Sequence, residues 1–342
     1  MSEFLEQAYA KGREVTVAYR DDDKLGNLRN LPGKWINAKE GVETGFEGRG
    51  WNMIALPFIK SGNDPDYRML VNQYNEVIEF QQIDGPVPNR GVDRPNKQNT
   101  DQALFALDYQ QGIVQIARED SPKSDDNTVG PVGGAIHHEP GFFLNIIDRR
   151  TDDLDIARLA TIPHGDSALA MGKSRVFSGK PTVEPVNGLP IGATQNLASP
   201  YLAPYVAFSG DNAFKRTDNF PGFDVVEPSK LLQFGIDFLD VKQTTELKFD
   251  TKLQTGGIVN TPFIVKQANA TEMTATFYIM ELNEPVPATG SPFVLAYIQV
   301  IFLEFFERFG NEPGLIRWPH VSINTMVFDK PQEEMTLEMP VY

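Results

Sequence analysis

The chain has 342 residues and a formal net charge of −15, from 31 Lys and Arg against 46 Asp and Glu. This balance argues against a nucleic-acid partner, because phosphate binding needs clustered basic side chains. A hydrophobic fraction of 41% and a charged fraction of 23% exclude a disordered chain. Cysteine is absent, which excludes disulfides, thiolate metal sites and cysteine nucleophiles. At about 150 residues per domain, the length predicts two domains.

The beginning of the chain predicts a short helix and a cytoplasmic location. Phe4, Leu5, Ala8 and Tyr9 form an apolar stripe at helical spacing. Residues 1–13 carry several charged side chains and no apolar h-region, so we expect no secretory signal.

No membrane span is expected from the sequence. The longest apolar stretch, residues 292–306, is interrupted by Tyr297, Gln299 and Glu304. It is shorter than the roughly 18 apolar residues that a membrane helix needs. Formation of a homo-oligomer is left open by these properties.

The rest of the chain is predicted to be all-β and mainly antiparallel. Short runs rich in Val, Ile, Thr and Phe are separated by clusters of Gly, Pro, Asn and Asp. Residues 241–253 show the clearest alternation, with Val241 and Leu247 on one face and Lys242 and Lys248 on the other. A strand of this length suits a coiled, closed sheet better than a small flat one.

Residues 293–309 fit two patterns. Leu295, Ile298, Phe302 and Phe305 would form a stripe on a helix. The content of β-branched and aromatic residues favours a fully buried strand instead. We predict a strand.

Two segments of the chain resemble each other. Residues 142–149 (FFLNIIDR) are similar to residues 301–308 (IFLEFFER), and each is followed by an apolar segment that ends in Pro-His, at His164 and His320. A rival alignment pairs two Glu-Pro-Gly sequences, and the two alignments cannot both hold. We interpret the similarity as a weak internal duplication, which predicts two tandem, related, barrel-like halves.

The predicted organisation has five parts. They are an N-terminal helix and lead-in over residues 1–30, a first barrel-like domain over 31–179, a linker over 180–205, a second barrel-like domain over 206–330, and an acidic tail over 331–342. The linker is assigned because this stretch is rich in Pro, Gly, Ala and Asn.

Searches for common catalytic motifs fail in this chain. It has no phosphate-binding Gly-rich loop, no GxSxG nucleophile elbow and no HExxH zinc motif. The candidates for chemistry are therefore the four histidines, His137, His138, His164 and His320. Imidazole is the commonest metal ligand, and without cysteine a haem iron would need histidine or tyrosine as its axial ligand. The plain alternative for each histidine is a hydrogen-bonded residue in the interior or at the rim.

The alternation of the last strand leaves the direction of His320 open. His320 shares a face with Trp318 and Asn324, whereas Val321 and Ile323 share the other face. If Val321 and Ile323 face the cavity, His320 points outward and binds nothing inside. The presence of Trp318 on the histidine face argues for the opposite orientation.

The sequence His137-His138-Glu139 is the second candidate. Neighbouring residues of a strand point to opposite faces, so at most one of the two histidines enters a given cavity. Glu139 can share a face with His137, where its carboxylate would orient the imidazole. The segment lacks the HxH spacing that places two imidazoles on one metal ion, so we expect no mononuclear cupin site.

Two short segments resemble known barrel families. Residues 31–35 (LPGKW), followed by a Gly-rich stretch, are similar to the opening of lipocalin-like and fatty-acid-binding-type barrels. Residues 320–326 (HVSINTM) resemble the closing strand of the nitrobindin-like haem β-barrels, whose histidine is the proximal haem ligand. The resemblance implies two lipocalin-type barrels, haem as the cofactor and His320 as the ligand of its iron.

The predicted cofactor-binding set contains three further residues. His164 follows from the internal repeat, and His137 and Trp318 complete the set. The first hypothesis for function is therefore the binding of haem inside a barrel cavity, with peroxidase-like or nitrogen-oxide chemistry.

Two other functions are compatible with the sequence, so whether the protein is an enzyme stays open. One is a metal-free carrier of an apolar small molecule, held in a cavity lined by Phe and Met. The other is a cofactor-free isomerase, hydratase or cyclase that acts on an apolar substrate. In that enzyme, Glu139 or Asp108 would act as acid or base if burial raised its pKa.

Overall fold

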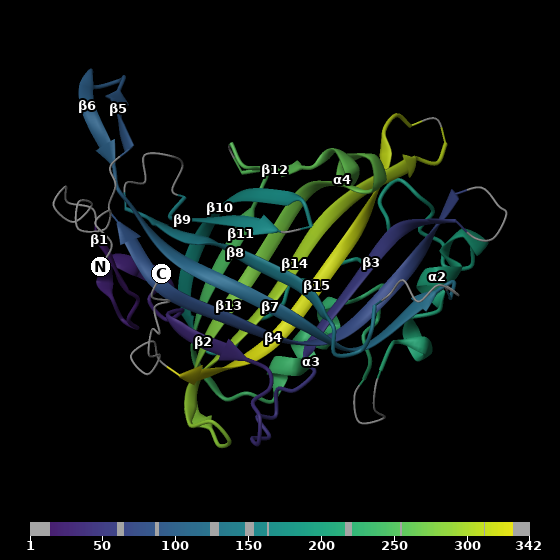
Figure 1. Cartoon of the computed structure of the whole chain (residues 1–342), viewed down its shortest axis with the longest axis horizontal. Helices are drawn as coiled ribbons and strands as arrows, with labels where there is room; N and C mark the ends of the chain where they lie inside the picture. Colours follow the sequence, from purple (N-terminus) through teal and green to yellow (C-terminus); the bar gives the residue numbers. More distant parts are fainter. Residues whose placement is uncertain are drawn as a thin grey trace, which may run out of the picture.

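The computed structural model describes residues 14–59, 65–85, 89–123, 130–147, 154–162, 164–215, 221–253, 255–310 and 312–330. Most of these residues lie in antiparallel strands that form one large closed sheet (Figure 1). The predicted all-β, mainly antiparallel class is therefore confirmed.

The strands are β1 (Glu14–Val17), β2 (Gly33–Ile36), β3 (Gly50–Ile59), β4 (Pro65–Gly85), β5 (Asn89–Asp93), β6 (Gln98–Gln102), β7 (Leu104–Ser121), β8 (Ala135–Ile146), β9 (Ile156–Ile162), β10 (Asp166–Ser178), β11 (Val241–Asp250), β12 (Gly257–Asn260), β13 (Asn269–Val286), β14 (Ser291–Glu307) and β15 (Leu315–Lys330). The helices are α2 (Ala203–Val206), α3 (Ser229–Asp237) and α4 (Pro262–Gln267), with 3₁₀ turns η1 (Asp23–Leu28), η2 (Pro200–Leu202) and η3 (Gly210–Asn212).

The barrel has ten strand positions. In order, these are β4, β2 together with β3, β15, β14, β13, β11, β10, β9, β8 and β7. Pairing of β7 with β4, from Met69 opposite Ser121 to Asp84 opposite Ala106, closes the ring. Closure leaves no free edge within the ring, which explains why such long strands remain paired.

The two tandem halves expected from the internal similarity do not form separate barrels. Strand β10 of the first half pairs with β11 of the second, and β15 pairs with β2 and β3. The physical reason is strand length, since β4 has 21 residues and both β7 and β13 have 18. Strands this long bury the apolar faces of both halves in one sheet, and residues 142–146 and 301–307 of the two similar segments lie in β8 and β14 of that sheet.

Inward-facing side chains fill the barrel with an aromatic core. Phe143 stands at its centre, with ring centroids 5.4 Å from Phe80, 5.2 Å from Phe249 and 5.4 Å from Phe277. Leu25 and Leu28 of η1 join the same cluster, at the end of the barrel where β8 finishes.

The opposite end of the barrel is where β8, β10 and β15 begin, and we call it the mouth. The turn between β9 and β10 lies here, and Thr261, just before α4, donates its backbone N–H to Gly165 of that turn at 2.8 Å. Strand β12 pairs with the first residues of β10, so β12 and α4 border the mouth (Figure 1).

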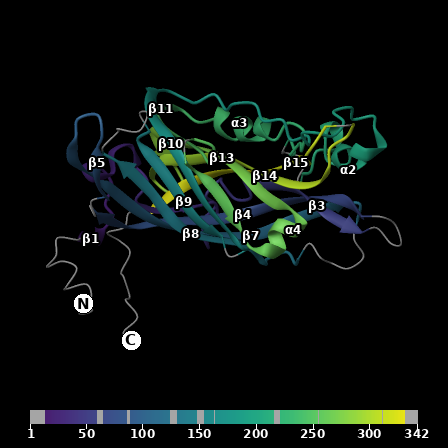
Figure 2. The same cartoon turned by 90° about the horizontal axis from the view of Figure 1, so that it is seen from above.

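The segment between β10 and β11 covers the outer face of β3, β14 and β15. Its helix α3 packs against β14 and β15, and α2 and α3 lie outside the sheet in Figure 2. Trp51 of β3 contacts Phe214 and Phe223 of this segment, with ring centroids 5.8 and 6.0 Å apart. Residues 180–205, expected to be a linker between domains, therefore belong to the packed cover of a single barrel.

Both strands predicted from their own pattern are present. Residues 241–253 contain β11, and residues 293–307 lie in β14, so the prediction of a strand rather than a helix for residues 293–309 is confirmed. The N-terminal helix and the acidic tail were predicted for segments that lie outside the described residues.

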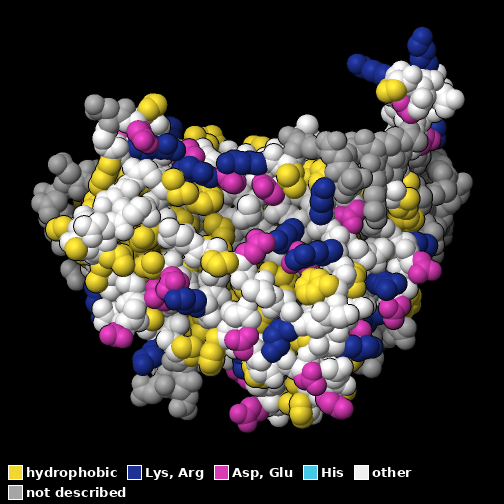
Figure 3. Space-filling model, turned by 180° about the vertical axis from the view of Figure 1, so that it is seen from behind, with side chains coloured by type: hydrophobic (Ala, Val, Ile, Leu, Met, Phe, Trp, Pro, Cys, Tyr) yellow, Lys and Arg dark blue, Asp and Glu magenta, His cyan; other side chains and the backbone are white. Residues whose placement is uncertain are grey.

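The described surface carries charges of both signs. Figure 3 shows Lys and Arg interspersed with Asp and Glu on one face, with hydrophobic side chains between them. Among the residues that the structure describes, no helix is long and apolar enough to cross a membrane.

Candidate functional site

The barrel brings three of the four histidines together at the mouth. His137 lies on β8, His164 in the turn between β9 and β10, and His320 on β15. The rings of His137 and His164 stack with centroids 5.7 Å apart and planes 28° apart. Burial, together with the proximity of the other two imidazoles, lowers the pKa of His320 from 6.5 to about 4. These residues are 183 positions apart at most in sequence (320 − 137), and closure of the sheet unites them.

His320 points into the barrel. It pairs with Ile301 of β14, and the next residues on its face pair with Gln299 and Tyr297, which line an internal cavity. The orientation that the sequence left open is thus inward. With its lowered pKa, the half-buried imidazole of His320 is uncharged at neutral pH and keeps a lone pair for a ligand.

A carboxylate holds His137 in place, as its spacing predicted. His137 Nε2 lies 3.2 Å from Glu139 Oε2. On the other side, Arg158 Nη2 donates to Glu139 Oε1 at 2.6 Å, and the Tyr109 hydroxyl donates to the same oxygen. His138, between these two inward residues, is exposed on the outer face of β8.

The charge of Glu139 is fixed by its neighbours. Burial alone would raise the pKa of its carboxyl, but the Arg158 guanidinium and the hydrogen bonds from His137 and Tyr109 lower that pKa to about 2. A carboxylate this acidic cannot be the raised-pKa acid that the cofactor-free enzyme hypothesis required. The other carboxyl named in that hypothesis, Asp108, has the raised pKa that the hypothesis requires, because burial outweighs the hydrogen bonds that it accepts from the backbone N–H groups of Gln81 and Gln82 at a bulge of β4.

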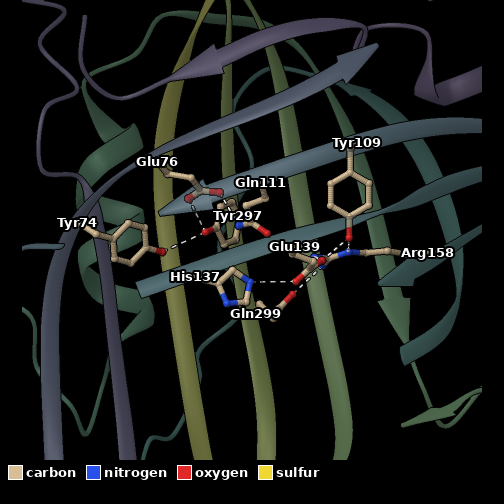
Figure 4. Close-up of polar contacts among 9 residues, drawn as sticks. All are labelled: Tyr74, Glu76, Tyr109, Gln111, His137, Glu139, Arg158, Tyr297 and Gln299. Carbon is tan, nitrogen blue, oxygen red and sulfur yellow. Dashed lines mark hydrogen bonds and ion pairs between the residues drawn. The ribbon is translucent and has the colours of Figure 1, made fainter. Parts of the chain in front are cut away.

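A second buried carboxyl group, Glu76, lies on β4 (Figure 4). Gln111 Nε2 donates to its Oε1 at 2.6 Å, and the Tyr297 hydroxyl and Asn324 Nδ2 each donate to its Oε2 at 2.7 Å. Tyr74 extends this network through a 3.0 Å contact between its hydroxyl and that of Tyr297. Burial raises the pKa of Glu76, and the three hydrogen bonds lower it only in part.

A small cavity separates the two networks. It is lined by Ile78, Phe80, Tyr109, Gln111, Phe143, Arg158, Phe277, Tyr297 and Gln299. It has room for about one water molecule. Figure 4 shows Gln299 beside Arg158, whose Nη1 donates to Gln299 Oε1 at 2.7 Å. A ligand larger than water does not fit this cavity, so a larger molecule would have to bind nearer the mouth.

Trp318, the remaining predicted site residue, lies in a different environment. Its ring stacks on Phe305 at 4.8 Å and contacts Tyr67 and Tyr201, the latter from the outer cover. Its Nε1 donates to the Phe305 carbonyl at 3.1 Å. The structure does not place Trp318 with the histidines in any contact that it describes.

Sequence reasoning missed the residues that support His137 and those that surround the small internal cavity. Glu76 and Gln111 lie next to other polar residues of their strands, Asn75 and Gln110, and so resemble ordinary solvent-facing positions. Gln299 was detectable, since it is a lone polar residue within the apolar run of β14. Arg158 was detectable, since it is the one charged residue in the apolar run of β9. A lone charge in a buried strand signals a buried partner.

Within the described part of the chain, no group of three or more His, Asp or Glu side chains is arranged to hold a metal ion. This finding concerns metal ions bound by protein ligands alone and does not bear on a haem, whose iron needs only one or two axial ligands from the protein. The imidazoles of His137 and His164 are close enough to lower the pKa of His320.

Comparisons with known proteins add little to this geometry. No model of a known protein family matches the chain, and no curated protein matches it. Among solved structures, the crystal structure of Rv2717c from M. tuberculosis shares 12% identity, with 90% of this chain and 98% of that chain covered and a TM-score of 0.34. A likeness at this level carries no argument about the fold or function of this chain, so both rest on its own structure.

Proposed function

We propose that the mouth of the barrel binds haem, with His320 as an axial ligand of the iron. The observation that supports this proposal is an inward-facing, half-buried imidazole whose pKa of about 4 keeps it uncharged at neutral pH. Only the uncharged ring can donate a lone pair to iron. The resemblance of residues 320–326 to the closing strand of nitrobindin-like barrels is compatible with the same role.

His320 could serve as the iron ligand, and the small volume of the internal cavity limits where the macrocycle could lie. The cavity between the two buried networks has room for about one water molecule and is too small for a porphyrin. The group would therefore sit at the mouth, where Ile301 lies beside His320 on the inner face and His137 and His164 stand nearby. When bound, haem supplies a redox-active iron that takes up small ligands.

Titration of the purified protein with hemin, followed by its absorption spectrum, tests the proposal. We expect a sharp Soret band that saturates at one haem per chain, and a lost or shifted band in His320→Ala. The matched control is His138→Ala, which removes an exposed imidazole from the outer face of β8 and should leave the band unchanged. A spectrum with only broad, non-saturating hemin absorption, or an unchanged band in His320→Ala, would overturn the proposal.

A metal-free carrier of an apolar small molecule is the second candidate, and a separate observation favours it. Val259, Phe263 and Val265, on β12 and α4 at the border of the mouth, are 73%, 71% and 51% exposed. Apolar side chains this exposed commonly mark contact sites for ligands or partners. Solvent extraction and mass spectrometry of the purified protein test this function. Extracts that match a buffer control, with no displacement of a bound hydrophobic dye, would exclude it.

A further inference from the structure

We propose that Glu76 is a neutral carboxylic acid in the folded protein at pH 7, and that its proton completes a hydrogen-bonded network that holds the interior of the barrel together. Loss of this proton at higher pH leaves a buried charge without a cation and weakens the network. The network is thus a pH-sensitive device built into the barrel. It makes no use of haem, so this inference does not depend on the proposed function.

The first step of the argument is the position of Glu76, which is 2% exposed. Gln111 Nε2 of β7 and Asn324 Nδ2 of β15 donate to its carboxyl group at 2.6 and 2.7 Å. The hydroxyl oxygen of Tyr297, on β14, lies 2.7 Å from Glu76 Oε2, and Figure 4 shows Gln111 and Tyr297 beside the carboxyl group. Three strands besides β4 therefore meet at one carboxyl group, and all three partners are uncharged.

The second step is a series of three oxygen–oxygen contacts that begins at Glu76. Glu76 Oε2 lies 2.7 Å from the Tyr297 hydroxyl, which lies 3.0 Å from the Tyr74 hydroxyl. The Tyr74 hydroxyl in turn lies 3.1 Å from the carbonyl oxygen of Ile323. We call these four groups the Glu76 network. Because a carbonyl oxygen only accepts, every hydrogen in these contacts must come from a tyrosine hydroxyl or from a protonated Glu76.

The number of hydrogens decides the charge of Glu76. If Glu76 is ionised, the two tyrosine hydroxyls supply two hydrogens for three contacts, so one pair of oxygens faces each other without a hydrogen. If Glu76 is protonated, it donates to Tyr297, Tyr297 donates to Tyr74, and Tyr74 donates to the Ile323 carbonyl. Each contact then holds one hydrogen. The amide groups that donate to Glu76 can do so in either state, so the geometry favours the protonated carboxyl.

The surroundings of Glu76 favour the same state. Burial raises its pKa, and burial also raises the pKa values of Tyr74 and Tyr297 well above their ordinary value, so both tyrosines stay uncharged. The other titratable group that acts on Glu76 is His137 of β8, whose charge, when it is protonated, favours the ionised carboxyl. Within the described residues, no Lys or Arg is a hydrogen-bond partner of Glu76. An ionised Glu76 would therefore be a buried charge with no permanent cation beside it.

Loss of the proton has a defined effect on stability. Because the folded pKa of Glu76 is above the ordinary value of 4.5, its contribution is present in full below pH 4.5 and is lost as the pH rises towards the folded pKa. Gln111 and Tyr297 also line the small internal cavity. Deprotonation therefore weakens the contacts that join the strands around this cavity.

Infrared spectroscopy tests the protonation directly. The C=O stretch of a carboxylic acid is separate from the bands of carboxylates and amides, and it shifts when the glutamate residues carry ¹³C. We expect a carboxylic-acid band at pH 7 that shifts with this label and disappears in Glu76→Gln. The label separates Glu76 from Asp108 and Asp166, two other carboxyl groups whose pKa is raised by burial. The matched control is Glu79→Gln, on the same strand, which removes a partly exposed carboxylate paired with Lys34 and should keep the band.

A tyrosine variant tests the hydrogen-bonded network itself. Tyr74→Phe removes one hydrogen and two of the three contacts, so the Tyr297 hydrogen alone satisfies an ionised Glu76. We expect the pH at which half of the carboxylic-acid band is lost to fall by roughly one unit, which is the shift that one hydrogen bond produces. The control is Tyr67→Phe, which removes a buried hydroxyl that donates to the Tyr201 carbonyl, and it should leave this pH unchanged. An unchanged value in Tyr74→Phe would overturn the role of the network.

Urea denaturation from about pH 5 to about pH 9 measures the effect on the fold. Glu76→Gln stays uncharged but cannot accept from Asn324, so we expect it to be less stable than the unchanged protein at the lower pH. The difference in urea midpoint should shrink or reverse as the pH rises. Both proteins keep His320, whose lowered pKa of about 4 contributes an opposite slope below pH 6.5, so the comparison cancels this contribution.

Two results would contradict the proposal. One is the absence at pH 7 of a carboxylic-acid band that shifts with the glutamate label, because Glu76 would then be ionised. The other is a difference in urea midpoint between the two proteins that stays constant with pH. If Glu76→Gln does not fold, the labelled band of the unchanged protein and its response to Tyr74→Phe still decide the question.

Discussion

At the scale of single residues, Glu139 and Glu76 are two buried carboxyl groups whose pKa values shift in opposite directions. Glu139 is ionised beside Arg158, and its pKa is lowered to about 2. Glu76 has no cation among its hydrogen-bond partners, and burial raises its pKa. Glu139 therefore stabilises the fold when it is charged, whereas Glu76 is more easily protonated in the folded protein than in the unfolded chain. Two glutamates on inward strand faces thus differ because one faces a guanidinium and the other faces neutral donors.

The buried ion pair predicts a large effect of removing one partner. Arg158→Met leaves Glu139 charged and unpaired inside the barrel, so we expect the free energy of unfolding at pH 7 to fall by roughly 3–5 kcal/mol. The double variant Arg158→Met/Glu139→Gln should lose less than Arg158→Met alone. Urea denaturation followed by tryptophan fluorescence measures both. The control is Arg90→Met, whose ion pair with Asp101 is exposed and should contribute about 1 kcal/mol or less.

The same pair predicts a pH dependence of stability. The folded pKa of Glu139, about 2, is below the ordinary value of 4.5, so its contribution is present above pH 4.5 and is lost as the pH falls towards 2. Urea denaturation across this range should show the loss in the unchanged protein and a smaller loss in the double variant. Equal acid sensitivity of the two proteins would show that the ion pair does not set this response.

At the scale of elements, alternation in the sequence was enough to find single strands but not their partners. Residues 241–253 and 293–309 contain strands because β-branched and aromatic residues alternate or cluster there. The partners of these strands depend on closure of the whole sheet, and no local pattern carries that information. The Pro- and Gly-rich composition of residues 180–205 is typical of a linker, but the same composition also suits an irregular cover whose few apolar side chains, such as Leu189 and Leu202, are buried.

The cover predicts a stability effect that a linker would not have. Leu232 and Ile236 of α3 are 1% and 0% exposed against the outer face of the sheet. Replacing either with Ala should lower the free energy of unfolding by roughly 2–5 kcal/mol, because a buried cavity remains. Lys230→Ala, on the exposed face of the same helix, is the control and should cost about 1 kcal/mol or less. Urea denaturation that gives all three variants the same stability would contradict the assignment of α3 to the core.

At the scale of the whole molecule, the candidate site exists only because one sheet closes. His137, His164 and His320 come from β8, the turn after β9, and β15, and both predicted halves contribute. The sequence pointed to these three histidines and to the pairing of His137 with Glu139, since those inferences needed only residue type and strand alternation. It did not point to Glu76 or to the approach of β8 to β15 across the barrel, because these depend on which strands lie opposite each other.

Closure into one barrel predicts that the two halves do not fold alone. Separated at residue 205, the first fragment would end its sheet at an unpaired β10 and the second at unpaired β11 and β15 edges. Exposed edges of this length favour aggregation over folding. We expect fragments 1–205 and 206–342 each to lack a cooperative urea transition and near-ultraviolet circular dichroism, and the intact chain to unfold in a single transition. Mixing the denatured fragments and removing urea should restore the near-ultraviolet signal, since the broken connection lies in the outer cover and not in a strand. Cooperative unfolding of either fragment alone, or two separate transitions in the intact chain, would instead support two independent domains.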